Sequence, residues 1–428
     1  MNISKFALLA IITFAFAGVA CVEQEQTIAH EMTGVDAGMT EDSDPLVQRA
    51  QEVIAKSPDS PKGYNQLAVV YIRKARETGD FPLNIKADEL IDKALALAPQ
   101  DLTARKLKAS LHLTLHRFPE GLEMGKQLQK EVPEDSFIWG VITDANTELG
   151  NYEEAVAAAQ RMVDIKPNTS SYARVAYLRS LHGDHLGAVE MYKVAARTAD
   201  PGDKEVQSWC LTQLGDEFLR NGKVSDAEKV YDEALSILPQ YPLALVGKGR
   251  ARAAQNDFSG ASDYIARANE RTPHTHTVIL LGDVYKRMGD LAKSRAQYDL
   301  AENGEEKLGD LHDAHRVALF WADNDINLDA ALKIAQDDYE TQKDIYAADT
   351  LAWCLYKKGR LDEAKSLARE AMRLGTNDAM LRFHAGMIEK GLGNRAEAKR
   401  LLESALALNP TFDLFQAERA RKALEELN

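Results

Sequence analysis

The sequence has few cysteines and no excess of basic residues. Only three cysteines occur in 428 residues, and Cys210 and Cys354 lie in apolar helical patterns that are typical of small buried residues. Their spacing fits neither a disulfide framework nor a zinc motif. Acidic residues outnumber basic ones by 66 to 52, which gives a formal net charge of −14. Because phosphate binding needs a basic face, this balance argues against a nucleic-acid partner.

Catalytic motifs are also missing. The chain contains no G-x-G-x-x-G, no Walker loop, no G-x-S-x-G and no C-x-x-C. The pairs His112/His116 and His312/His315 have spacings that could place two rings on one helix face, but neither pair has a third ligand. Acidic pairs at the starts of helices suit the helix dipole better than acid–base chemistry. We therefore expect no enzyme, no cofactor and no metal site.

The N-terminus has the pattern of an export signal. One lysine precedes an apolar run from Phe6 to Ala17 and a stretch of small residues, so residues 1–20 are predicted to be a signal peptide that is too short to span a membrane. The sequence Gly18-Val19-Ala20-Cys21 resembles a bacterial lipobox, although that family usually has Leu where Gly18 stands. The resemblance implies that Cys21 is lipidated. Plain secretion remains an alternative, because the same small residues fit an ordinary cleavage site.

An acidic segment follows the proposed lipidation site. Val22 to Asp44 contains seven acidic residues, no lysine or arginine, and no apolar periodicity. Such a segment cannot bury enough surface to offset the entropy of ordering, so residues 21–44 are predicted to be a disordered tether. We expect an exported protein in the cell envelope, lipid-anchored to the outer membrane and facing the periplasm. A secreted or soluble periplasmic protein is the alternative.

Prolines recur along the chain at a fixed interval. Pro99, Pro133, Pro167 and Pro201 are each 34 residues apart, and so are Pro239 and Pro273. A fixed period between 20 and 50 residues predicts a repeat architecture.

One period illustrates what repeats. In LGNYEEAVAAAQRMVDIKP, Gly150 ends one helix, and Ala155, Ala159 and Met162 share one face of the next. The alanines are small, so a neighbouring helix can approach closely. Pro167 ends the run and begins the next repeat.

The repeating pattern resembles the tetratricopeptide (TPR) repeat, W-x2-L-G-x2-Y…A-x3-F…P. Its best copy is formed by Leu211, Leu214, Gly215, Phe218, Gly222, Ala227, Tyr231, Ala234 and Pro239. The resemblance implies an all-α fold, a right-handed α-solenoid of about ten TPR helix-turn-helix repeats with a C-terminal capping helix. We place the half repeat at 45–60, the solenoid at 61–410 and the capping helix at 411–428.

Three places depart from the period. The first repeat has seven extra residues, which predict a loop insertion around ETGDFPLN, and about four are added near Gly202. A similar excess falls between Ala301 and His315. The positions near 202 and 307 are therefore candidate hinges, and tolerated loop variation is the alternative.

A partner of a solenoid is expected in the concave groove lined by the first helix of each pair. Stripes beside the packing columns predict a groove that would hold an apolar peptide or helix, formed by Arg316, Phe320, Asp349, Trp353, Tyr356, Phe383 and Met387. Alternatively, Trp353 and Phe320 fill gaps between repeats. A secondary polar groove is predicted from Asp216, Arg220, Arg250, Asp283 and Arg287.

These features together predict a membrane-tethered scaffold or adaptor that mediates protein–protein interactions in the bacterial cell envelope. The resemblance to TPR proteins implies protein or peptide partners, but the sequence does not identify them. The alternative is a glycan-binding or regulatory subunit of an envelope assembly or secretion machinery.

Overall fold

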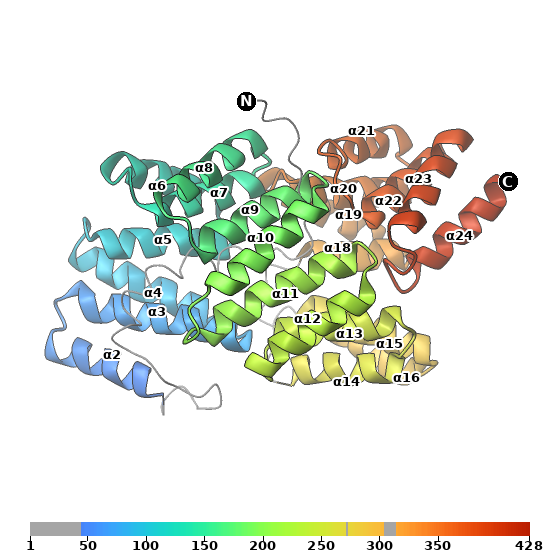
Figure 1. Cartoon of the computed structure of the whole chain (residues 1–428). Helices are drawn as coiled ribbons and strands as arrows, with labels where there is room; N and C mark the ends of the chain where they lie inside the picture. Colours follow the sequence, from blue (N-terminus) through green and yellow to red (C-terminus); the bar gives the residue numbers. More distant parts are fainter. Residues whose placement is uncertain (1–43, 271–272, 304–313) are drawn as a thin grey trace. The chain divides into compact units, whose positions relative to one another are not determined.

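The computed structural model describes residues 44–270, 273–303 and 314–428, and all regular structure in these ranges is α-helical (Figure 1). A lone helix, α2 (Pro45–Lys56), comes first and α24 (Gln416–Leu427) comes last. Between them lie ten consecutive helix pairs: α3 (Pro61–Thr78) and α4 (Pro82–Leu97), α5 (Leu102–Thr114) and α6 (Phe118–Glu131), α7 (Ser136–Glu148) and α8 (Tyr152–Ile165), α9 (Thr169–Leu181) and α10 (His185–Thr198), α11 (Lys204–Arg220) and α12 (Val224–Ile237), α13 (Pro242–Ala254) and α14 (Phe258–Asn269), α15 (Thr275–Met288) and α16 (Leu291–Asn303), α18 (Ala314–Asp323) and α19 (Leu328–Thr341), α20 (Ile345–Lys357) and α21 (Leu361–Ala371), α22 (Ala379–Gly391) and α23 (Arg395–Leu408).

The predicted all-α solenoid of ten repeats is confirmed within these ranges. The proposed signal peptide, the tether up to Ser43 and the candidate hinge near 307 lie outside the described residues. Among the helices that are described, none is both long and apolar enough to cross a bilayer.

Most helix pairs are joined by a three-residue turn with a left-handed residue at its centre. Glycine fills this position at Gly150 (φ 72°), Gly222 (φ 69°) and Gly359 (φ 74°). Glycine suits the turn because it lacks the Cβ atom that makes positive φ costly. His116 (φ 55°) and Asn256 (φ 62°) occupy the same place in their own pairs. The turn geometry therefore recurs even where the residue type does not.

Small residues let the helices of a pair approach closely, as the sequence predicts. The alanines of the second-helix column are fully buried, namely Ala155, Ala227, Ala261, Ala364 and Ala398. Gly215 shows how tight the contact is, because a Cβ atom at this position would lie 2.5 Å from Cε1 of the Tyr231 ring. The large ring on α12 thus requires glycine on α11, which explains why the two positions occur together in this repeat.

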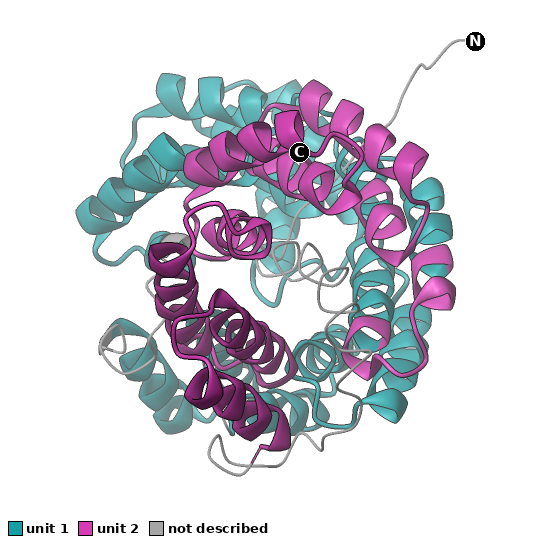
Figure 2. Cartoon of the chain, turned by 90° about the vertical axis from the view of Figure 1, so that its left-hand side faces the viewer, with its two compact units in different colours: residues 1–11, 176–193, 208–428 teal, residues 12–175, 194–207 magenta. Residues whose placement is uncertain are grey.

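The described chain forms two compact units (Figure 2). Unit 1 contains residues 176–193 and 208–428, and unit 2 contains residues 44–175 and 194–207. Within unit 1, consecutive helices pack against each other from α12 to α16 and from α18 to α23, α15 contacts α18, and α24 packs against α22 and α23. Within unit 2, the same sequential packing runs from α2 to α8.

The extra residues of the first repeat lengthen helices instead of forming a loop. Helix α3 has 18 residues where α7 has 13, and α4 has 16 where α8 has 14. The turn between α3 and α4 keeps the usual three residues, so the predicted loop insertion is wrong. Helix α11 is likewise long, with 17 residues. It therefore accommodates most of the extra residues that the sequence adds to the repeat period near Gly202.

The two lengthened helices meet inside unit 2. Arg76, in the last turn of α3, donates from Nε to Oε2 of Glu205, in the first turn of α11, at 3.1 Å. The Glu205 side chain is only 3% exposed and that of Arg76 is 13% exposed. This ion pair joins positions 129 residues apart. The extra residues that lengthen α3 and α11 therefore take part in a buried contact between the two helices.

Unit 1 has its own long-range contacts, in which side chains bond to the open ends of helices. The Thr376 hydroxyl donates to the Leu181 carbonyl at 2.6 Å, and Nδ2 of Asn409 donates to the Leu219 carbonyl at 2.9 Å. Both carbonyls belong to the last turns of first helices, which have no partner within the helix. Loops late in the sequence therefore cap helices about 190 residues earlier.

We predict that Arg76→Met destabilises unit 2, because it leaves the buried Glu205 carboxylate without this guanidinium. The expected loss is about 1–3 kcal/mol of unfolding free energy. Hydrogen exchange should also quicken in the last turn of α3 and the first turn of α11. Lys56→Met is the control, because Lys56 pairs with Glu52 on an exposed surface and should matter by less than about 0.5 kcal/mol. Equal effects of the two variants would contradict the prediction.

Candidate protein-binding site

Most of the predicted aromatic groove is buried inside unit 1. Trp353 is 2% exposed and Phe383 is fully buried, while Phe320 and Asp349 are each 5% exposed. The remaining predicted positions, Arg316, Tyr356 and Met387, are half-buried. The prediction of open aromatic anchors is therefore wrong. The alternative, that Trp353 and Phe320 fill gaps between repeats, is the one that the burial supports.

Trp353 is the centre of an aromatic cluster that joins three helices. Its ring stacks on Tyr356 of the same helix at 4.9 Å and on His384 of α22 at 4.1 Å, and it lies 5.7 Å from Phe383. Its indole Nε1 donates to Oδ1 of Asp323, at the end of α18, at 2.9 Å. Because the polar tip also has a partner, Trp353 stabilises the stacking of three successive repeats.

Charged groups surround this cluster. Nδ1 of His384 lies 2.7 Å from Oδ2 of Asp349. Burial alone would lower the pKa of His384, but the Asp349 carboxylate and the charges of Asp323 and Asp378 raise it. Burial raises the pKa of Asp323 to about 6, partly offset by His384. The predicted groove position Asp349 thus serves as the counter-charge of a buried histidine.

The C-terminal strap, which we define as residues 409–419, lies over the first-helix face of unit 1. Phe415 of the strap packs between Lys286 and Arg287 of α15, with cation-to-ring distances of 5.1 and 5.7 Å. Gln416 donates from Nε2 to Oδ1 of Asp323 at 2.5 Å. The strap therefore contacts both α15 and α18, on the face where a partner was expected.

Apolar strap residues extend the same contact. Phe412 lies 5.8 Å from the ring of Phe383, and Leu414 packs against the cluster formed around Leu281 and Val284 of α15. The chain's own C-terminal segment thus contacts the predicted groove at Phe383 and continues along the neighbouring helices α15 and α18.

The predicted polar groove is largely satisfied within the chain. Asp216 accepts a hydrogen bond from the Tyr231 hydroxyl at 2.6 Å and lies 3.4 Å from Nη1 of Arg250. Arg220 donates from Nη1 to Oε2 of Glu217 at 2.6 Å. Burial raises the pKa of Asp216 despite these partners. Asp216 thus links α11 to α12 and α13, and Arg220 pairs within α11, while Oδ2 of Asp216 and Nε of Arg220 have no hydrogen-bond partner among the described residues.

Two further predicted positions lie on α15. Asp283 accepts a hydrogen bond from the Tyr298 hydroxyl at 2.6 Å, and Arg287 pairs with Glu418 of α24 at 3.2 Å. Burial, together with the charges of Asp413 and Asp323, raises the pKa of Asp283 to about 7, although the Tyr298 hydrogen bond lowers it. Asp283 therefore carries a destabilising charge at neutral pH.

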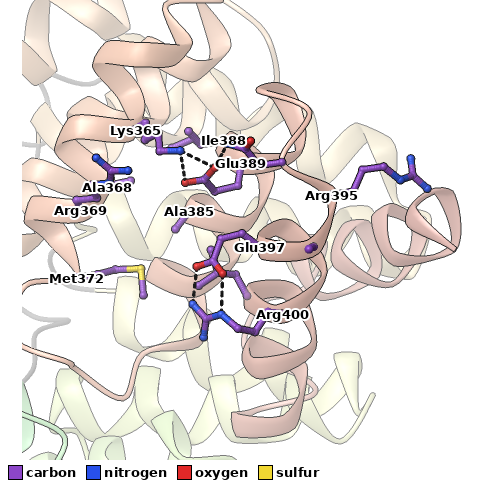
Figure 3. Close-up of a pocket in the computed structure, with 13 residues that line it drawn as sticks. Lys365, Ala368, Arg369, Met372, Ala385, Ile388, Glu389, Arg395, Glu397 and Arg400 are labelled. Carbon is purple, nitrogen blue, oxygen red and sulfur yellow. Dashed lines mark hydrogen bonds and ion pairs between the residues drawn. The ribbon is translucent and has the colours of Figure 1, made fainter.

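A pocket of about 680 Å³ lies elsewhere in unit 1, among α21, α22 and α23 (Figure 3). Its apolar lining consists of residues from all three helices and the turn after α21: Ala368, Met372, Ala385, Ile388, Ala396 and Leu401. Several of these are alanines, which leave room that larger side chains would fill. The volume lies within the range typical of ligand pockets.

Charged side chains form the rim of this pocket. Lys365 of α21 bonds to both carboxylate oxygens of Glu389 at 2.9 Å. Arg400 makes a two-point contact with Glu397 at 2.6 and 2.8 Å. Arg369 also lines the pocket and is exposed, and it has no carboxylate partner within the described residues. This rim was not predicted, because arginines spaced along an exposed helix face resemble ordinary solvated surface.

The pair His112/His116 belongs to no metal-binding cluster among the residues that the structure describes. His116 occupies the left-handed turn position, next to the ring of Phe118 at 5.2 Å. Burial, together with Lys108, lowers the pKa of His112. Within the described residues, no group of three or more His, Cys, Asp or Glu side chains could hold a metal ion. His312 lies outside the described residues, as does the side chain of His315.

Consecutive helix pairs with small-residue packing columns define an α-solenoid, a class that presents extended binding surfaces. Two family models, both described as tetratricopeptide repeat, match residues 212–274 and 381–412. The chain is a tetratricopeptide-repeat protein, and such repeats make it a protein-interaction scaffold. No curated protein matches it significantly.

Several solved structures resemble the fold at low identity. The APC/C hetero-tetramer Cut9–Hcn1 is 14% identical with a TM-score of 0.35, and the match covers 96% of this chain and 95% of that one. Human IFIT1, solved as a dimer with PPP-AAAA, is 13% identical over 94% and 96%, with a TM-score of 0.47. The type IV pilus biogenesis factor PilW is 16% identical over 48% and 94%, with a TM-score of 0.41. At these scores none of the structures informs what this chain binds.

We predict that Asp283→Asn stabilises the protein at pH 8. The pKa of Asp283 is raised to about 7 in the folded state from 3.8, so the folded state binds its proton more tightly than the unfolded state does. Its contribution to stability is therefore favourable at low pH and is lost as the pH rises from about 4 to about 7. The amide keeps the oxygen that accepts from Tyr298, so the variant should gain about 2–4 kcal/mol at pH 8 and little at pH 4.

Urea unfolding at both pH values measures this difference. Asp226→Asn serves as the control, because Asp226 is exposed and pairs only with Lys229 on its own helix. It should change stability by less than about 0.5 kcal/mol at either pH. A destabilised Asp283→Asn at pH 8 would contradict the prediction. It would show that partners of the Asp283 carboxylate stabilise its charge in the folded state.

Proposed function

We propose that this TPR protein is a lipid-anchored scaffold of a bacterial cell envelope, which holds protein partners at the surface of its repeats. The anchor would be a lipid on Cys21, and the acidic segment 22–44 would separate it from the first helix. The motivation for the tether is the N-terminal sequence, in which an apolar run and small residues lead directly to a lone cysteine. Outer-membrane attachment facing the periplasm is the arrangement that we propose.

The observation that carries the scaffold role is the ten consecutive helix pairs. Each pair enlarges the surface on which a partner could bind. Within the described residues, no group of His, Cys, Asp and Glu side chains could hold a metal ion. Within unit 1 the first-helix face is covered by the strap, while the pocket among α21, α22 and α23 is not filled by any described part of the chain (Figure 3). We therefore propose the second-helix side of the last two pairs as the partner-binding surface.

The tether is tested by Cys21→Ala in a bacterial host with a native lipoprotein pathway. The variant should move from the membrane pellet to the soluble envelope fraction. Without the lipid, the acidic segment 22–44 has no apolar group that would hold the chain to the membrane. Lipid incorporation is measured in parallel by labelling with a fatty acid.

Cys210→Ala is the matched control, since Cys210 is fully buried in unit 1 and its loss should leave fractionation unchanged. A Cys21→Ala variant that stays in the membrane fraction without labelling would refute the lipid anchor. It would leave the scaffold role standing, and the retention would then have to come from a membrane partner.

A further inference from the structure

The pocket among α21, α22 and α23 has a charge character opposite to that of the chain as a whole. The protein carries a formal net charge of −14. The pocket lining nevertheless contains four basic side chains, Lys365, Arg369, Arg395 and Arg400, and only two acidic ones, Glu389 and Glu397. An excess of positive charge in one concavity of an acidic protein points to a negatively charged ligand.

The two acidic side chains are already neutralised. Both oxygens of Glu389 lie 2.9 Å from Nζ of Lys365, and Glu397 is held at two points by Arg400. These pairs hold the rim side chains in place. The excess positive charge is therefore that of Arg369 and Arg395. Neither of these arginines has a carboxylate partner within the described residues; Arg395 donates from Nη2 to the backbone carbonyl of Glu426 at 3.4 Å.

Figure 3 shows Arg369 at one side of the pocket and Arg395 at the other, where the Arg395 side chain extends away from the lining toward the Glu426 carbonyl of α24. Between them lies an apolar lining that includes Ala385 and Leu401, which are 5% and 4% exposed. A ligand that fits both features carries carboxylates at two places with an apolar group between them. Guanidinium groups recognise carboxylates by paired N–H bonds in one plane, which gives arginine an advantage over lysine in such a role.

We propose that this pocket binds an acidic peptide segment of a partner protein, with an apolar side chain in the pocket and carboxylates at Arg369 and Arg395. The inference rests on the proposed scaffold function and names the chemistry of its partner. The volume of about 680 Å³ accommodates one large side chain with its flanking backbone. The ion pairs of Lys365 and Arg400 hold two sides of the rim, and on binding the exposed Arg395 side chain turns from the Glu426 carbonyl toward the ligand.

The test uses the full chain and a fluorescein-labelled peptide, GEELEELEEG, in a polarisation titration. A peptide with every Glu replaced by Gln reports the contribution of charge. Because a hydrogen bond to a charged group contributes about 1.5–3 kcal/mol, Arg369→Glu with Arg395→Glu should weaken binding by at least about tenfold. Raising the salt concentration should weaken it as well.

The control double variant is Lys229→Glu with Lys333→Glu, which changes the net charge by the same amount. Both lysines are exposed on other helices of unit 1 and pair only locally. Circular dichroism should be unchanged in both double variants, because all four positions are on the surface. A third variant, Ala396→Trp, fills the exposed edge of the pocket without changing charge and should also reduce binding.

Binding that is lost in the arginine variant and in Ala396→Trp, but kept in the lysine control, supports the proposal. Equal weakening in the two double variants would overturn it in favour of non-specific attraction. So would equal binding of the Gln peptide, or no binding of the acidic peptide at all. None of these outcomes depends on the lipid anchor, so failure of the pocket and failure of the tether are distinguishable.

Discussion

No helix pair in this chain can bury its own apolar face, and the structure follows from that constraint. Each second helix presents a column of alanines, and each first helix must approach it closely, as Gly215 does against Tyr231. The next pair then covers what remains exposed. Stacking on this principle would leave open helix ends and an uncovered inner face. In unit 1, Thr376 and Asn409 bond to helix-end carbonyls and the strap contacts first helices, while in unit 2 the pair Arg76–Glu205 ties α3 to the start of α11.

Because the chain's own C-terminal strap lies over the first-helix face of unit 1, that face is a less suitable place for a binding partner. An aromatic residue on a solenoid's first-helix face is a natural candidate for binding, but Trp353 is stacked between Tyr356 and His384 and bonded to Asp323. Its burial stabilises three repeats at once. Asp323, which bonds to Trp353, and Asp283, which bonds to Tyr298, have raised pKa values mainly because the protein partly removes them from water. For this reason the partner surface that we propose is on the second-helix side.

The sequence predicted the repeat number, the helix pairs and the alanine columns, because these depend on local periodicity that every copy repeats. It placed Pro61 and Pro45 at helix starts correctly. It could not predict that Arg76 and Glu205 meet, since pairing over 129 residues has no local signal. For the same reason the strap residues Phe412 and Phe415 looked like part of a polar cap. The rim of the pocket was missed because Lys365 and Arg369 are four residues apart on a helix, a spacing that solvated helices use everywhere.

The central claim is that the C-terminal strap covers the first-helix face of unit 1 and holds early helices through long-range bonds. Hydrogen–deuterium exchange of an Asn409→Asp variant tests it most directly. The substitution keeps the acceptor for the Thr411 amide but puts a carboxylate against the Leu219 carbonyl. The account predicts faster exchange at the end of α11 and in α15 as well as around residue 409. Faster exchange confined to residues 408–412 would contradict it.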